Sequence, residues 1–247
     1  MRYQKIRFAD QASLCVFPDD RTNLAKVATE LRLEGSYPVI VLIGGDIDAQ
    51  HAEITRLAIQ TIARTAENIH AVMICGGTDM GVMAEIGRVR QQNHYKFPLL
   101  GIAPEELVSW PGGPRSTKFL WWGKKRWPLA PHYSHFMLVP GSQFGDESPW
   151  ILDMASLLSQ GRKAVTMLIN GGEVSRTDIQ LSLAIGRPVI VLSRTGRLAD
   201  ELASQPDRDE LITIIQGDMQ QRIVDTVQAA LSVKEIRIPA QAFISIT

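Results

Sequence analysis

Apolar residues in this chain gather in short continuous runs instead of alternating with polar residues. Runs of this length without alternation are typical of strands that are buried on both faces of a parallel sheet. The pattern therefore predicts about seven strands. The runs occupy 38–43, 70–75, 97–103, 134–139, 165–169, 188–193 and 211–215.

Helical periodicity fills most of the gaps between these runs. In 50–66, Ile54, Leu57 and Ala58 have i, i+3, i+4 spacing and mark one face of a helix. Strands that alternate with helices predict an open, doubly wound, mostly parallel α/β sheet with helices on both faces. Further helices are predicted at 79–93, 149–160, 175–186, 197–205 and 218–231.

The two ends of the chain carry a different pattern, in which apolar and polar residues alternate. We expect the extension at 1–35 to contribute a β-hairpin or edge strands. The arm at 232–247 is expected to be an edge strand or to contact a partner. Both segments flank the sheet of a single predicted domain, residues 1–247.

One segment, 104–133, is long for a connection inside a compact domain. It holds four of the five tryptophans and is rich in basic residues, with no acid between Leu107 and Gly145. It could close over a ligand, with a tryptophan stacked on a base and Arg115 or Lys118 on a phosphate. An oligomer interface and a platform for single-stranded nucleic acid are the alternatives.

Composition and charge narrow the class of protein. Apolar residues make up 45% of the chain, and 26 basic residues cancel 26 acidic ones, so no global field favours nucleic acid or an anionic membrane. Two cysteines, no apolar leader and apolar runs too short to cross a bilayer indicate a cytoplasmic protein. The cysteines and histidines lack metal-ligand spacing, and we expect neither a metal site nor a cofactor.

Glycines directly follow four of the predicted strands. In a parallel sheet these positions share the carboxyl edge, where open α/β sheets bind ligands. Glycine lets the backbone approach a ligand closely, and the N-terminus of the next helix favours an anion. Tight turns without a ligand are the alternative, and both G-x-G-x-x-G and the Walker A motif are absent. The glycines are Gly44, Gly45, Gly76, Gly77, Gly81, Gly141, Gly171 and Gly172.

Polar residues beside these glycines complete the predicted ligand site. Hydroxyl groups and carboxylates can bind ribose or phosphate, and arginines can bind phosphate. Helix capping and surface ion pairs are the alternatives, and Ser175 with Asp178 resembles a capping box. The predicted ligand contacts are Asp46, Thr78, Ser142, Glu173, Ser175, Arg176 and Arg194.

Three motifs carry a resemblance to a known superfamily. ICGGTDMGVMAEIGR, HFMLVPGSQFGDESPWILDMASLL and GRKAVTMLINGGEVSRTDIQLSLAIGRPVIVL resemble SLOG domains, over about residues 36–230. The variant that they are most similar to is the prokaryotic relative of the SLOG domain of TRPM channels. The resemblance implies a Rossmann-like fold and binding of nucleotide-derived signals such as ADP-ribose or cyclic ADP-ribose.

A sister branch, the LOG phosphoribohydrolases, releases the base from nucleoside 5′-monophosphates and carries the hallmark PGGxGTxxE after an Arg-Lys pair. Here Val174 replaces the third glycine and Asp178 replaces the glutamate. Asp178 is the candidate catalytic residue, but its side chain is one methylene shorter, and Val174 disfavours positive φ in a phosphate loop. The remaining hallmark positions fall on Arg162, Lys163, Asn170, Gly171, Gly172 and Ser175.

These observations lead to one hypothesis and two alternatives. We expect a module that binds or senses a nucleotide-derived small molecule and forms a homo-oligomer, a dimer or larger. The first alternative is a LOG-type phosphoribohydrolase or N-glycosidase. The second is single-stranded nucleic-acid binding, because the DNA-processing protein DprA uses a related Rossmann-like domain, but net neutrality counts against it.

Overall fold

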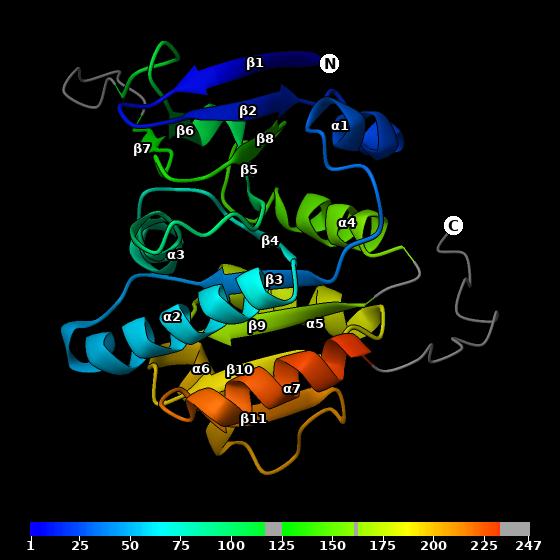
Figure 1. The fold of residues 1–247 in the computed structure, drawn as a ribbon. Coiled ribbons are helices and arrows are strands. Elements are labelled where there is room, and N and C mark those ends of the chain that lie inside the picture. Colours follow the sequence, from blue (N-terminus) through cyan, green and yellow to red (C-terminus); the bar gives the residue numbers. More distant parts are fainter. Residues whose placement is uncertain (117–124, 161–162, 233–247) are drawn as a thin grey trace.

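The computed structural model describes residues 1–116, 125–160 and 163–232. A single sheet of nine strands forms its centre, with helices on both faces (Figure 1). The strands are β1 (Arg2–Arg7), β2 (Ala12–Phe17), β3 (Val39–Gly44), β4 (Val72–Cys75), β5 (Leu99–Pro104), β8 (His135–Val139), β9 (Ala164–Ile169), β10 (Val189–Ser193) and β11 (Ile212–Gln216). Their order is β1-β2-β8-β5-β4-β3-β9-β10-β11, and only β1 with β2 is antiparallel.

The predicted strands and the open, doubly wound sheet are confirmed. All seven continuous apolar runs form strands, and the N-terminal extension adds a hairpin whose outer strand, β1, buries only Ile6. Within 104–133, β6 (Val108–Ser109) pairs with β7 (Trp127–Pro128) in a separate two-stranded sheet.

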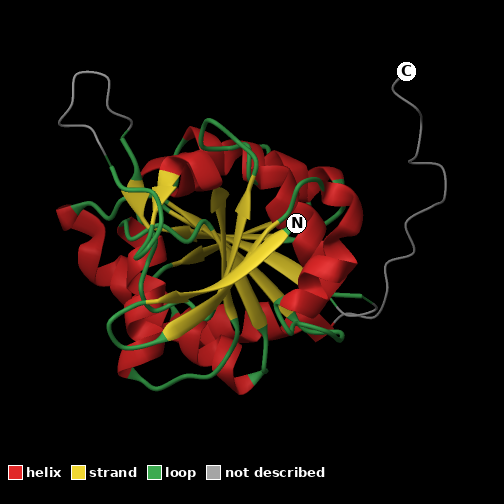
Figure 2. Ribbon diagram, turned by 90° about the horizontal axis from the view of Figure 1, so that it is seen from above, coloured by secondary structure: helices red, strands yellow, loops and turns green. Residues whose placement is uncertain are grey.

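Two apolar layers hold the helices against the sheet, and Figure 2 shows helices on both sides of the strands. The helices are α1 (Leu24–Glu30), α2 (Ala52–Asn68), α3 (Gly81–Gln92), α4 (Ser148–Leu158), α5 (Glu173–Ala184), α6 (Arg197–Ser204) and α7 (Gln220–Ser232). Alternate residues of a strand point to opposite faces. Ile40 and Leu42 of β3 therefore pack with α2, α3 and α7, whereas Val41 and Ile43 pack with α1, α4, α5 and α6.

The winding of the chain reverses beside β3. The chain places β4, β5 and β8 in turn on one side of β3, and it then returns to place β9, β10 and β11 on the other side. The helix that follows β3 lies on one face of the sheet and the helix that follows β9 lies on the opposite face. Their connections diverge, and such a switch point opens a crevice at the carboxyl ends of the strands.

Three of the sequence predictions concern residues outside the described ranges. They are Lys118 in the insertion, Arg162 in the Arg-Lys pair and the C-terminal arm from residue 233 onward. Among the residues that are described, no helix has the length and apolar character needed to cross a membrane.

Candidate functional site

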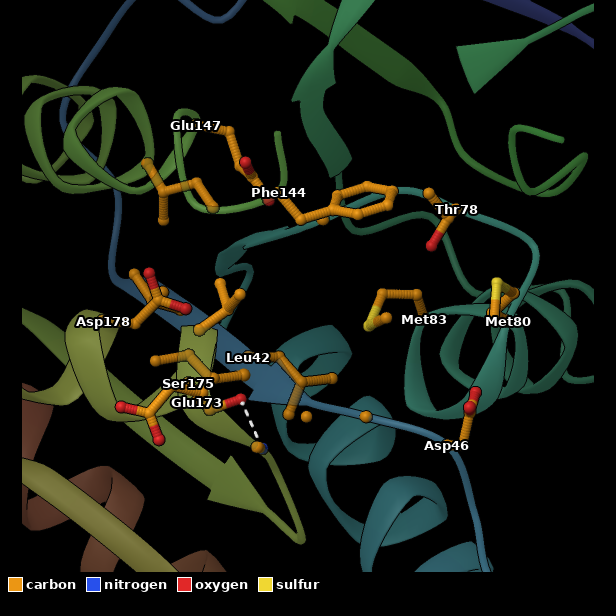
Figure 3. A pocket seen from close by; sticks show the side chains of 18 of the residues that line it. Leu42, Asp46, Thr78, Met80, Met83, Phe144, Glu147, Glu173, Ser175 and Asp178 are labelled. Carbon is orange, nitrogen blue, oxygen red and sulfur yellow. Dashed lines mark hydrogen bonds between the residues drawn. The ribbon is translucent and has the colours of Figure 1, made fainter. Parts of the chain in front are cut away.

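A cavity of about 420 Å³ lies in this crevice (Figure 3). Its walls come from the connections after β3, β4, β8 and β9 and from the first turns of α3, α4 and α5. Sites for small ligands are usually concave pockets of roughly 300–1,000 Å³. The cavity therefore has the size of a small-molecule site, at the sheet edge where the glycines predict one.

Apolar side chains form most of the cavity walls. Met83 of α3 and Ile151 of α4 line it together with Phe144, which is 36% exposed. Phe144 packs edge-to-face on Trp127, with 5.1 Å between ring centroids. The ammonium group of Lys125 lies 4.4 Å from the Trp127 centroid. Part of the tryptophan-rich segment thus reaches the cavity and offers aromatic surface beside a cation.

Two carboxyl groups, Glu147 and Asp178, lie on one side of the cavity (Figure 3). Glu147 ends the loop before α4, is 6% exposed and accepts a 2.7 Å hydrogen bond at Oε2 from the N–H of Gly145. Burial raises the pKa of Glu147 to about 7, and the charge of Asp178 adds to the rise. Burial also raises the pKa of Asp178 to about 6, which the Ser148 hydroxyl opposes.

Arg197, the first residue of α6, also lines the cavity. Its backbone has φ of 52°, a conformation that costs a non-glycine residue free energy and is most frequent at functional sites. A Cβ at Gly45 would lie 2.6 Å from Nη1 of Arg197, and a Cβ at Gly172 would lie 2.9 Å from Nη2. The two glycines therefore make room for the guanidinium between their loops.

Arg197 has no carboxylate partner within 4.0 Å anywhere in the described ranges. The two arginines that the sequence predicts as ligand contacts, in contrast, both form ion pairs. Arg176 pairs with Glu201 at 2.8 Å and with Glu173 at 3.6 Å, and Arg194 pairs with Asp218 at 2.6 Å. Neither Arg176 nor Arg194 lines the cavity.

The predicted glycines divide into two groups. Gly44, Gly45, Gly76 and Gly172 line the cavity. The others allow close packing against neighbouring strands, loops or side chains: for example, a Cβ at Gly77 would lie 2.8 Å from the Cα of Gly101 in β5. The second group is Gly77, Gly81, Gly141 and Gly171.

The predicted polar residues divide in the same way. Asp46, Thr78, Glu173 and Ser175 line the cavity together with Asp178. Ser142 does not, and its N–H donates a 2.8 Å hydrogen bond to Asp146.

The alternative in which Ser175 and Asp178 form a capping box is wrong. The helix α5 begins at Glu173, two residues before the predicted start, with Gly172 as N-cap. The N–H of Gly172 donates a 3.3 Å hydrogen bond to Ser175 Oγ, which places Ser175 at N3. Asp178 lies past the first turn, where the backbone N–H groups are already used, so its carboxyl group is left to the cavity.

Asn170, which stands where the LOG hallmark has proline, has a backbone conformation that is uncommon for a non-glycine residue. Its φ is 50°, and its side chain accepts a 2.7 Å hydrogen bond from the N–H of Gly45 and donates a 3.0 Å bond to the carbonyl of Asp46. Val174 is helical and has no positive φ. The side chain of Asn170 therefore ties the two loops that enclose Arg197.

Sequence reasoning did not single out Arg197, Phe144 or Glu147 as cavity residues, and it expected a tryptophan of 104–133 at the ligand without identifying it as Trp127. The sequence feature that could have indicated Arg197 is the preceding residue, Gly196, which is a further glycine after a strand. In the structure Gly196 has φ of 91°. Among the described residues, no group of three or more His, Cys, Asp or Glu side chains is placed to hold a metal ion.

Solved structures of similar fold agree with this architecture. One, a crystal structure from a structural genomics consortium, has a TM-score of 0.55 at 19% identity and covers 78% of this chain and 99% of its own. The molybdenum cofactor binding protein of the phototrophic bacterium Rippkaea orientalis has a TM-score of 0.53 at 15% identity, covering 79% of this chain and 98% of its own. At such identities the likeness shows the fold alone. No curated protein matches the sequence.

The family comparison bears on the whole site. The sequence model described as "SLOG in TRPM, prokaryote" matches residues 37–234, which include every strand from β3 onward and all of the loops around the cavity. Because the match covers well over half of the sequence, the chain belongs to this prokaryotic family of SLOG domains.

Proposed function

We propose that this protein binds a nucleotide-derived small molecule in the cavity, for which ADP-ribose and cyclic ADP-ribose are candidates, and that it does so without cleaving a bond. The observation that carries the proposal is the guanidinium of Arg197, which has no carboxylate partner among the described residues and lies between two glycine loops at the rim of an otherwise mainly apolar cavity. An unpaired arginine at a cavity rim suits a phosphate, because its fork of N–H groups can bind two phosphate oxygens at once.

The apolar part of the cavity suits the remainder of such a ligand. Phe144, Trp127 and Met83 provide flat and polarisable surface for a base, and Asp46 and Thr78 provide acceptors and a hydroxyl group for sugar. The structural neighbour from Rippkaea orientalis is a molybdenum cofactor binding protein, which adds support for a small-molecule ligand and not for its identity.

Hydrolysis of a nucleoside monophosphate is the weaker proposal. The LOG hallmark is incomplete here, because Val174 and Asp178 stand where that pattern has glycine and glutamate. Incubation of the protein with AMP and with ADP-ribose tests the difference. We expect bound nucleotide and no free adenine; release of adenine that Asp178→Asn abolishes would instead establish an enzyme.

Replacing Arg197 with Met is expected to weaken binding of phosphate-bearing ligands by about tenfold to a hundredfold, the range for loss of a charged hydrogen-bond partner. Arg176→Met and Arg194→Met are the matched controls, since both of these guanidinium groups already pair with carboxylates outside the cavity. Titration calorimetry with AMP and with ADP-ribose measures the three affinities. Equal losses in all three variants would show that the phosphate does not bind at Arg197.

A further inference from the structure

Glu147 and Asp178 form an acidic pair that no cation in the described part of the chain neutralises. Neither carboxylate has a Lys, Arg or His partner within 4.0 Å among the described residues. Glu147 is more than nine-tenths buried, and its Oε2 accepts a hydrogen bond from the N–H of Gly145. Burying a carboxylate is costly unless it is well hydrogen-bonded, so this pair favours additional donors.

Because both carboxyl groups line the cavity, a ligand bound there can supply these donors. The Ser148 hydroxyl faces Asp178, but several of the side chains that line the cavity with the pair, such as Phe144, Ile151 and Val174, cannot donate a hydrogen bond. Arg197 and the glycine loops belong to the rim formed by β3, α5 and α6. In Figure 3 the two carboxyl groups lie on the side opposite Met80, Met83 and Asp46. A phosphate would be repelled from this side, whereas N–H groups would be attracted to it.

We propose, building on the nucleotide-binding function above, that Glu147 and Asp178 select a ligand ring whose edge carries two neighbouring N–H donors. This is the 2-amino-4-oxopyrimidine edge that guanine and pterins share. An ionised carboxyl group is an acceptor only, and it binds two parallel N–H donors in the strong bidentate arrangement. Adenine and cytosine instead place a ring-nitrogen acceptor beside their amino group, and uracil has a single N–H between two carbonyls.

The proposal sets the direction of the pH dependence. Glu147 faces Asp178 of α5, with Asp146 next to it in its own loop; Asp178 faces Ser148 of α4. Two N–H donors require ionised acceptors, so affinity for a guanine nucleotide is expected to rise from pH 5.5 to pH 8. A ring edge with one acceptor would favour a protonated carboxyl group and would show the opposite trend.

GMP and IMP are the matched probes, because they differ only in the 2-amino group. Titration calorimetry at pH 8 is expected to show GMP binding about tenfold more tightly than IMP, as expected for one hydrogen bond to a charged group. Glu147→Gln and Asp178→Asn should bring GMP down to the affinity of IMP or below. In Glu147→Gln the amide oxygen of the new side chain can still accept the hydrogen bond from Gly145, so this variant keeps the loop. Glu210→Gln, at an exposed acid outside the cavity, is the control and should change neither affinity.

The outcomes separate this inference from the proposed function. Equal binding of GMP and IMP, or tighter binding of AMP that depends on Arg197, would overturn the ring preference and leave nucleotide binding in place. Absence of binding for GMP, IMP, AMP and ADP-ribose alike would overturn both. A preference for GMP that survives Glu147→Gln and Asp178→Asn together would overturn the assignment of ring recognition to this acidic pair.

Discussion

Replacing Glu147 with Gln is expected to make the protein more stable than the wild type at pH 8 but not at pH 5. The pKa of Glu147 is raised from its ordinary 4.5 to about 7, chiefly by burial. Between these values the unfolded chain has lost the proton that the folded chain still holds, so wild-type stability falls as pH rises through this window. The full loss is on the order of 3 kcal/mol above pH 7, and Gln, which cannot ionise, does not incur it.

Urea unfolding at pH 5, 6, 7 and 8 measures this dependence. The free energy of unfolding of the wild type should decline relative to that of Glu147→Gln across the series. Asp178→Asn should act in the same direction, because burial also raises the pKa of Asp178, from 3.8 to about 6. At pH 8 the double variant should gain less stability than the sum of the gains of the two single variants, because the charge of Asp178 contributes to the raised pKa of Glu147. Parallel curves for the wild type and Glu147→Gln would show that Glu147 is solvated and not buried as described.

The sheet could be predicted from the sequence because a strand that is buried on both faces appears as a continuous run of apolar residues. In β3 (VIVLIG) apolar and polar residues do not alternate as they do in a strand with one face in solvent, and the run is too short for a typical helix. The helix α1 was not predicted, because it has only seven residues and lies in a segment assigned to an extension of the sheet. Its apolar residues Leu24, Val27 and Ala28 have helical spacing, but two turns give too few repeats to decide.

The candidate site was predictable in position but less so in composition. Glycines after parallel strands share one edge by topology alone, and Gly45, Gly76 and Gly172 line the cavity at that edge. Whether an arginine on that edge reaches the ligand depends on which acid is packed next to it, and this is a tertiary contact. Arg194 meets Asp218, 24 residues away, whereas Arg197, three residues later, meets none within the described ranges.

Replacing Gly81 with Ala is expected to destabilise the protein by about 3 kcal/mol or more, whereas Gly76→Ala, five residues earlier, should change stability by less than about 0.5 kcal/mol. Gly81 begins α3 with φ of 49°, and a Cβ there would overlap the carbonyl group of Gly45 and lie 2.8 Å from the Cα of Asp46. That carbonyl accepts a 3.0 Å hydrogen bond from the N–H of Val82, so the Gly45 loop cannot move away without losing it.

Gly76 lies in the same connection but has room for a methyl group, because the nearest atom to an added Cβ is Cγ of Met83, at an ordinary contact distance of 3.8 Å. Gly76→Ala should therefore fold normally. Because the added methyl group would enter the cavity, the variant should nevertheless bind AMP and GMP more weakly than the wild type. Urea unfolding and calorimetry on both variants test this contrast, and soluble yield reports on Gly81→Ala if it does not fold. The contrast follows from the two roles of strand-end glycine, one in packing loops together and one in leaving room for a ligand. Similar stabilities for the two variants, or unchanged ligand affinity in Gly76→Ala, would contradict that division.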